Sequence, residues 1–168
     1  QDAKALEELA QKLHGSKDVV SFTLLCDPSD GMHATLSGVA FFVDGTSFYV
    51  PVGQERIDEN TLKETLGTWF ASDHPKVSAQ CKYARHALAN TGIELNRSTE
   101  DVTLLSYVIE AHMKHELSNL ALRWLKEDVP ALEDLIGKGA KQIRCQAVEV
   151  EAAARFCAAR AQAISDLF

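Results

Sequence analysis

Residues Lys76–Leu95, KVSAQCKYARHALANTGIEL, contain the local signals on which the fold assignment depends. Pro75 comes directly before them, and the short run 76–79 predicts a strand. A helix is expected from about Lys82 to Asn90, and Gly92 ends it because glycine readily adopts the positive φ found at helix C-termini. A strand followed at once by a helix is typical of folds that pack helices on a sheet.

Three strand-like runs lie upstream of this stretch. The run 18–25 predicts a strand buried on both faces, because it is almost continuously apolar. The runs 36–43 and 47–52 are joined by Asp44-Gly45-Thr46, and Asp-Gly between two apolar runs predicts a hairpin. Before them, apolar residues recur at helical spacing over 3–13.

Helical patterns occupy most of the rest of the chain. Thr61-x-x-Glu64 has the form of a capping box, and Asp101 is expected to cap a later helix. Trp69, Phe70 and Trp124 fall on apolar helical faces and are expected in the core. Three strands, then alternating strand and helix, then mostly helix predict an α/β fold, a mixed sheet of about five strands flanked by helices.

Composition limits the possible classes of protein. The chain has 168 residues, 46% of them hydrophobic, which suits one domain with a real core. No apolar run approaches the ~20 residues of a membrane-spanning helix. The net charge is −7, so strong binding of the isolated domain to nucleic acid is not expected. The four cysteines form no C-x-x-C pair, which favours reduced thiols and a cytosolic location.

Five blocks of the sequence, in this order, resemble one known family. They are the Tyr-x-Pro strand at 49–51, the stretch 76–95, DVTLLSYVI at 101–109, the HELSNLA…RWL run at 115–125 and GKGAKQ at 137–142. The chain resembles the 3′–5′ proofreading exonuclease domain of bacterial DNA polymerase I. The resemblance implies a ribonuclease H-like exonuclease fold, which ribonuclease D shares, and a single domain over 1–168 excised from a longer polymerase.

The resemblance also implies a particular chemistry. The family holds two divalent metals, roughly 4 Å apart, with four carboxylates, and a tyrosine orients the attacking water. Here the family's Phe-Asp-x-Glu strand is Phe22 to Leu25, so Thr23 and Leu25 stand at the positions of the two acids. Ala84 replaces the aspartate after Lys-Tyr, and Phe156 and Arg160 replace the tyrosine and aspartate of Tyr-x-x-x-Asp. We therefore expect no catalytic residue, no metal site and no other cofactor.

Arg160 is expected to supply positive charge where a metal ion is bound in the family. Its expected partner is Asp27 or Asp30, from the loop after the first strand. The alternative is that the arginine points to solvent.

Four polar residues are candidate DNA contacts. Lys138, Lys141 and Arg144 form a small basic cluster, and Gln80 lies just before the helix at 82–90. They would touch the DNA backbone in the intact polymerase. The alternative for the basic cluster is a solvated run of charge.

Other chemistries have weaker support in the sequence. A relocated metal site would draw on Asp27, Asp30, Asp101 or the pair Glu149 and Glu151, but two residues two apart on a helix face different sides. These positions also suit turns and helix caps.

A zinc site or a phosphate loop has less support still. His112-x-x-His115 places two imidazoles on one helical face, yet no third zinc ligand follows at the usual spacing. The loop Gly137-Lys138-Gly139 follows a helix, whereas a P-loop follows a strand and reads G-x-x-x-x-G-K-[ST].

The leading functional interpretation is an inactive proofreading domain that supports the polymerase domain, in cis, during DNA replication and repair. DNA would be a partner only through the parent DNA-directed polymerase, a bacterial cytoplasmic protein associated with the nucleoid, with no membrane contact. Two alternatives remain open: an active exonuclease with relocated ligands, and a protein-interaction module on the same scaffold.

Overall fold

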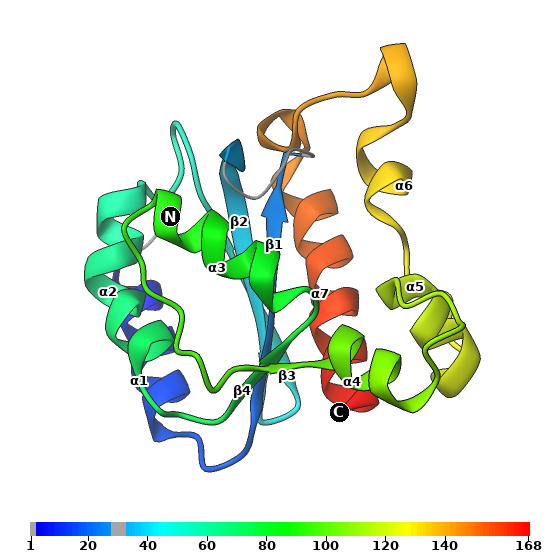
Figure 1. Ribbon diagram of the computed structural model, residues 1–168. Helices are drawn as coiled ribbons and strands as arrows, with labels where there is room; N and C mark the ends of the chain where they lie inside the picture. The colour runs from blue at the N-terminus through cyan, green and yellow to red at the C-terminus, as the bar shows by residue number, and fades with distance from the viewer. Residues whose placement is uncertain (1–2, 28–32) are drawn as a thin grey trace.

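A five-stranded mixed sheet lies at the centre of the computed structural model, which describes residues 3–27 and 33–168 (Figure 1). The strand order is β3-β2-β1-β4-β5. The β1–β2 and β2–β3 pairs are antiparallel, and the β1–β4 and β4–β5 pairs are parallel. The strands are β1 (Val20–Cys26), β2 (Leu36–Val43), β3 (Thr46–Pro51), β4 (Lys76–Ser78) and β5 (Glu100–Asp101). The predicted mixed sheet is confirmed.

The hairpin between β2 and β3 turns on two residues with positive φ. Asp44 has φ 49° and Gly45 has φ 73°, and Val43 pairs with Thr46 across the turn. Two positive φ values define the type I′ turn, whose twist matches that of the paired strands. The hairpin predicted from Asp-Gly is therefore present.

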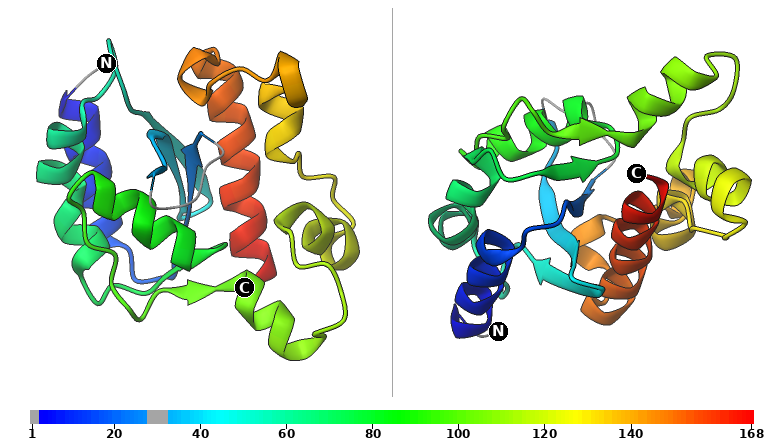
Figure 2. Two further views of the ribbon diagram at one scale, coloured as in Figure 1. Left: turned by 45° about the horizontal axis from the view of Figure 1, so that its top comes forward. Right: turned by 90° about the horizontal axis from the view of Figure 1, so that it is seen from below.

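Helices cover both faces of the sheet (Figure 2). Three lie on one face: α1 (Ala3–Gly15), α2 (Glu59–Ala71) and α3 (Cys81–Asn90). The long α7 (Val150–Leu167) packs against β1, β2 and β3 on the other. The remaining short helices lie beside α7, beyond the sheet. They are α4 (Val102–Ile109), α5 (Leu117–Leu120), the π-helical turn η2 (Ala121–Leu125), α6 (Leu132–Ile136), and the 3₁₀ turns η3 (Gly139–Lys141) and η4 (Cys145–Ala147).

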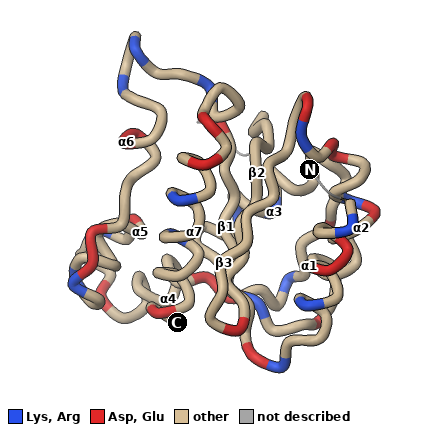
Figure 3. The backbone as a smooth tube through the Cα atoms, turned by 180° about the vertical axis from the view of Figure 1, so that it is seen from behind, with Lys and Arg blue, Asp and Glu red and all other residues tan. Residues whose placement is uncertain are grey.

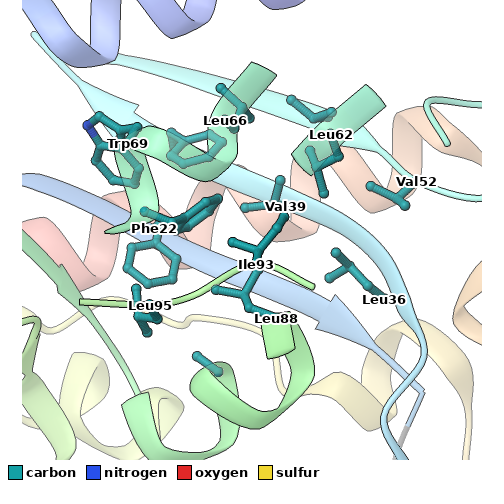
Figure 4. Close-up of a cluster of buried hydrophobic side chains, with 14 of the residues drawn as sticks. Phe22, Leu36, Val39, Val52, Leu62, Leu66, Trp69, Leu88, Ile93 and Leu95 are labelled. Carbon is teal, nitrogen blue, oxygen red and sulfur yellow. The ribbon is translucent and has the colours of Figure 1, made fainter. Parts of the chain in front are cut away.

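Aromatic rings form the centre of the core between the sheet and α2 (Figure 4). Phe22, Phe41, Trp69 and Phe70 are all fully buried. Phe41 and Trp69 meet edge to face at 5.5 Å, and Phe22 meets Phe70 at 5.4 Å. Such pairs add about 0.5–1.5 kcal/mol each beyond the burial of their area. The predicted core positions of Trp69 and Phe70 are confirmed.

The start of α2 differs from the sequence prediction. The helix begins at Glu59, and Asp58 is its N-cap, with Oδ1 accepting from the backbone N of Thr61 at 3.0 Å. The hydroxyl of Thr61 donates to the same carboxylate at 2.6 Å. The capping box expected at Thr61 and Glu64 is therefore wrong, because an aspartate three residues earlier satisfies the free N–H groups first.

Asp101 joins the starts of two helices, and only 7% of its surface is exposed. The predicted cap of α4 is confirmed, since Oδ1 accepts from the N of Thr103 at 2.9 Å and of Leu104 at 3.3 Å. The same carboxylate also accepts from the N of Gln80 at 3.2 Å and of Cys81 at 2.6 Å, at the start of α3. A buried carboxylate that receives several N–H groups is well compensated for the loss of water.

The change Asp101→Ala is expected to lower the free energy of unfolding by about 2–4 kcal/mol, because four backbone N–H groups lose their acceptor. Urea unfolding followed by circular dichroism measures the loss. Asp58→Ala is the matched control, since it removes an exposed cap that serves one helix. Equal losses in the two variants would show that Asp101 is an ordinary cap.

Candidate functional site

A cavity of about 490 Å³ opens between β1, α3 and α7. Short segments at the starts of α4, α5 and α6 complete its walls. Its lining residues are Thr23, Leu24, Cys26, Ser78, Ala79, Gln80, Tyr83, Ala84, Thr103, Glu116, Leu117, Ser118, Ala131, Leu132, Glu133, Phe156 and Arg160. The volume lies within the range of about 300–1,000 Å³ found for small-molecule sites.

Four of the five residues that the resemblance singles out line this cavity. Thr23 comes from β1, Ala84 from α3, and Phe156 and Arg160 from successive turns of α7. Leu25 is not in the lining and is 1% exposed. It packs in an apolar cluster that includes Phe156. Segments far apart in the sequence therefore meet at this cavity. Leu25 lies outside it, in apolar surroundings.

Arg160 is held in the cavity wall by a carbonyl and an aromatic ring. Its Nη1 donates to the carbonyl of Pro130 at 2.9 Å, and the guanidinium lies 5.3 Å from the centre of the Phe156 ring. Burial lowers the pKa of the Arg160 guanidinium, since removal from water disfavours its charge. The side chain nevertheless stays protonated at physiological pH.

The ion pair expected between Arg160 and Asp27 is not formed. Asp27 instead accepts a hydrogen bond from the backbone N of Cys145, at 2.6 Å from Oδ1. Asp30 lies outside the described residues. The solvent-facing alternative is also wrong, because Arg160 lines the cavity and contacts Pro130 and Phe156.

Hydroxyl groups supply much of the remaining polarity of the cavity. Thr23 is 7% exposed and lines the cavity. The Thr103 hydroxyl is buried and has no hydrogen-bond partner within 3–27 and 33–168. Ser78 Oγ donates to the carbonyl of Phe22 at 2.7 Å. No sequence motif marks Ser78 or Thr103 as site residues, because they reach the cavity only through the tertiary fold.

Two carboxylates line the cavity, and both have other partners. Glu133 pairs with Lys138 at 2.6 Å, and Glu116 accepts from Nδ2 of Asn119 at 3.0 Å. No group of three or more His, Cys, Asp or Glu residues that could hold a metal ion occurs in 3–27 or 33–168. Apart from these two carboxylates, the polar side chains of the cavity wall are mainly neutral hydroxyls, together with the cationic guanidinium of Arg160.

The candidate DNA contacts fall in two places. Gln80 is exposed and lines the cavity. Lys138, Lys141 and Arg144 are exposed and outside the cavity lining. They lie on the segment between α6 and η4, which extends away from the sheet (Figures 1 and 3). The fold therefore places Gln80 and the basic cluster apart, with Lys138 tied to the cavity rim through Glu133.

The histidine pair has a structural environment. His115 Nδ1 lies 3.0 Å from Ser106 Oγ, and its ring meets that of Tyr107 edge to face at 5.3 Å. His112 is exposed. These contacts tie the segment before α5 to α4.

All four cysteines are free and buried, as expected for core thiols. Burial raises the pKa of Cys26, Cys81, Cys145 and Cys157 to about 12. Thiols with pKa values this high are almost entirely protonated at neutral pH and are poor nucleophiles. Cysteine-based catalysis therefore has no support.

An exposed apolar surface, which the sequence did not reveal, covers α4 and η2. Trp124 is 54% exposed, so its expected place in the core is wrong. A groove of about 340 Å³ runs between Leu105, Ile109 and Trp124 and the end of α7 at Leu167. Other large apolar side chains are exposed on α4, on η2 and on the segment between them: Leu104, Tyr107, Val108, Met113 and Leu122. No helix in the described residues is long and apolar enough to span a membrane.

Comparison with known proteins identifies the family. The family model for the ribonuclease H-like domain of DNA polymerase I matches residues 24–167. DNA polymerase I of Pseudomonas aeruginosa is 30% identical over 152 residues, which are 84% of this chain and 17% of that protein. DNA polymerase I of Chloroflexus aurantiacus is 29% identical over 167 residues, which are 95% of this chain and 17% of that protein. The chain thus spans about one sixth of the length of these relatives.

Solved structures show the same fold at low sequence identity. RNase D of Trypanosoma brucei, in complex with RNA U12, superposes with a TM-score of 0.79 at 10% identity, covering 99% of this chain and 59% of that one. A structure of the POL domain of Pol1 from M. smegmatis, with DNA primer-template and dNTP, gives a TM-score of 0.74 at 19% identity, over 99% and 25%. With a family model over most of its length and relatives in two bacterial polymerases, this chain belongs to the ribonuclease H-like family of DNA polymerase I, as a 3′–5′ exonuclease domain.

Proposed function

We propose that this chain is a DNA polymerase I exonuclease domain that has lost two-metal chemistry and has an architectural role. One observation carries the proposal: the guanidinium of Arg160 lies in the wall of the cavity that Thr23, Ala84 and Phe156 also line. These are positions at which the family resemblance implies metal-binding or water-orienting groups.

The donor set does not suit a pair of divalent ions. Mg²⁺ and Mn²⁺ require several oxygen ligands, usually carboxylates. Ala84 and Leu25 have no oxygen in their side chains, and Thr23 offers one neutral hydroxyl. A guanidinium beside a divalent cation adds a repulsion on the order of several kcal/mol in a partly buried site. No step of metal-assisted hydrolysis can therefore be assigned to these residues.

A relocated metal site has little support, because the candidate carboxylates are engaged elsewhere. Asp101 accepts four backbone N–H groups, and Asp27 accepts the N–H of Cys145. Glu149 and Glu151 are exposed at the start of α7, and Glu151 pairs with Arg155. Neither glutamate lines the cavity.

Incubation with single-stranded DNA and Mn²⁺ is expected to give no trimming from the 3′ end, because the cavity lacks the carboxylates that hold the ions. Denaturing gel electrophoresis of end-labelled oligonucleotide measures the products. A family member that trims the same substrate is the positive control, and EDTA is the negative control. Trimming by this chain that is lost on addition of EDTA would falsify the inactive interpretation.

The exposed apolar surface on α4 and η2 supports an architectural role. Large contiguous apolar surfaces on soluble domains mark interaction sites. We infer that the occupant is the remainder of a DNA polymerase I polypeptide, because the chain spans 17% of the length of its relatives. The same surface favours this role over a general protein-interaction module, since contact in cis needs no separate partner.

The net charge of −7 fits a domain that meets DNA mainly through an attached polymerase domain. The polymerase would retain primer extension, and this domain would serve DNA replication and repair in the bacterial cytoplasm, close to the nucleoid. Gln80, Lys138, Lys141 and Arg144 are the residues proposed to touch the DNA backbone in that context.

Val108→Asp tests the docking surface, because Val108 is 83% exposed on α4. In the isolated chain the change is expected to alter the free energy of unfolding by less than about 0.5 kcal/mol. In a DNA polymerase I that carries this chain as its exonuclease segment, it is expected to speed cleavage between the domains in limited proteolysis. Val150→Asp, at the opposite end of α7, is the control. Identical digestion of the two variants would exclude the surface as the contact.

A further inference from the structure

A groove of about 320 Å³ lies along the second half of α3 and the segment 92–97 that follows it. Two arginines line it: Arg85 comes from α3, and Arg97 comes from the following segment. Its lining residues within 3–27 and 33–168 are all different from those of the cavity that contains Arg160. The groove is therefore a separate feature, on a part of α3 that the proposed function does not use.

The surface around the groove is positively charged, although the chain as a whole is acidic. Residues 81–97 contain three Lys and Arg residues and one Glu, whereas the whole chain has 17 Lys and Arg against 24 Asp and Glu. Lys63 of α2 adds a further cation, because a methyl group on the lining residue Gly92 would lie 2.9 Å from the Nζ of Lys63. Charges more than a Debye length away, about 8–10 Å at physiological salt, are largely screened. The local cations therefore determine what the groove attracts.

The guanidinium of Arg85 is only weakly engaged by the protein. Its Nη2 lies 3.5 Å from the carbonyl oxygen of Asn96, beyond the usual N–H···O range of about 2.7–3.2 Å. Its buried Nε has no hydrogen-bond partner within the described residues. Arg97 is exposed. Because arginine binds a carboxylate through two parallel N–H···O bonds, these two side chains can hold carboxylates of a partner.

The walls of the groove are held in place before any partner binds. The backbone N of Ile93 donates to the carbonyl of Leu88 at 3.0 Å, and that of Asn96 donates to the carbonyl of Phe70 at 2.9 Å. The side chain of Asn96 also donates to the carboxylate of Asp73 at 2.9 Å. Ile93 lies in the main core cluster (Figure 4). A preformed surface loses less conformational entropy when a ligand binds.

The composition of the groove favours an acidic peptide over nucleic acid. None of its described lining residues is aromatic, whereas proteins that hold single-stranded nucleic acid stack the bases on aromatic side chains. Glu94 also lines the groove, and its carboxylate opposes a strand that carries one charge per nucleotide. The remaining lining is apolar, at Ala89, Ile93 and Leu95, and suits an aliphatic side chain next to a carboxylate.

We propose that this groove docks a short acidic peptide segment of a partner protein, with one carboxylate bound by Arg85 and another by Arg97. Aliphatic residues alternate with aspartate or glutamate in such a segment. Lys63 strengthens the attraction from the side of α2. The inference goes beyond the proposed function, because the groove overlaps neither the cavity nor the groove between α4, η2 and the end of α7.

Fluorescence polarisation tests the proposal, with a fluorescein-labelled peptide of alternating aspartate and leucine as the probe. The expected Kd lies between about 10 μM and 1 mM. Arg85→Gln is expected to weaken binding about 5–50-fold, because a charge-assisted bidentate contact is lost. Arg97→Gln is expected to weaken it about 2–10-fold, since exposed ion pairs contribute less. A peptide of alternating lysine and leucine is expected to bind at least about tenfold more weakly.

Arg155→Gln is the matched control, because Arg155 is an exposed arginine of α7 that pairs with Glu151 and lies outside the groove lining. It is expected to bind the probe as the unchanged chain does. Urea unfolding of each variant separates lost binding from lost folding. Arg97→Gln keeps the test valid if Arg85→Gln does not fold, because Arg97 is exposed.

Two-dimensional NMR of the isotope-labelled chain locates the bound peptide. The amide signals of residues 85–97 are expected to shift more than those of Thr23 and Phe156 in the cavity or of Leu105 and Trp124 on the apolar surface. Larger shifts at either of those other places would contradict the assignment of the groove.

Four binding results would also overturn the proposal. They are no binding of the aspartate peptide at about 10 mM, unchanged binding in both folded arginine variants, equal binding of the lysine peptide, and tighter binding of single-stranded DNA that the two arginine variants weaken. These failures leave the proposed function standing, because it does not depend on this groove. Metal-dependent trimming of DNA, in contrast, contradicts the proposed function and leaves the groove unaffected.

Discussion

The carboxylate of Asp101 is the constraint on which the geometry of the cavity depends. It ends β5, the last strand of the sheet, and fixes the starts of α3 and α4 from a position that is 7% exposed. Ala84 and Tyr83 follow within one turn of the start of α3, and Thr103 lies in the first turn of α4. One side chain therefore orients two walls of the site relative to the sheet. The third wall, α7, is set independently by its packing on β1, β2 and β3.

The four aromatic residues at the centre of the core do not line the cavity. The aromatic cluster of Phe22, Phe41, Trp69 and Phe70 lies on the face of the sheet covered by α2. Leu25 packs on the opposite face, against α7, in a second cluster. A leucine at that position adds apolar contacts to the α7 interface, where a carboxylate would require a counter-ion. The packing of Leu25 therefore needs no charged partner in the cavity.

The sequence predicted the parts of the structure that short-range chemistry decides. Asp44-Gly45 gave the hairpin, and Asp101 gave the cap of α4, because both depend on residues within a few positions. The predicted start of α2 was wrong because Asp58 and Thr61 are both plausible N-cap residues. The backbone conformation of the folded chain makes Asp58 the cap. Trp124 was wrongly assigned to the core, since helical spacing shows that a face is apolar but not whether anything covers it. Likewise, the contact between Arg160 and Pro130 joins residues 30 apart and had no local signal.

The burial of all four cysteines has a practical consequence for measuring motion in this domain. None of the native thiols is both accessible and ionised at neutral pH. A single cysteine introduced at an exposed position would therefore be the main site of reaction with a maleimide dye. Fluorescent reporters can be attached one at a time without first replacing the native residues, so distances between this domain and an attached polymerase become accessible to energy-transfer measurements.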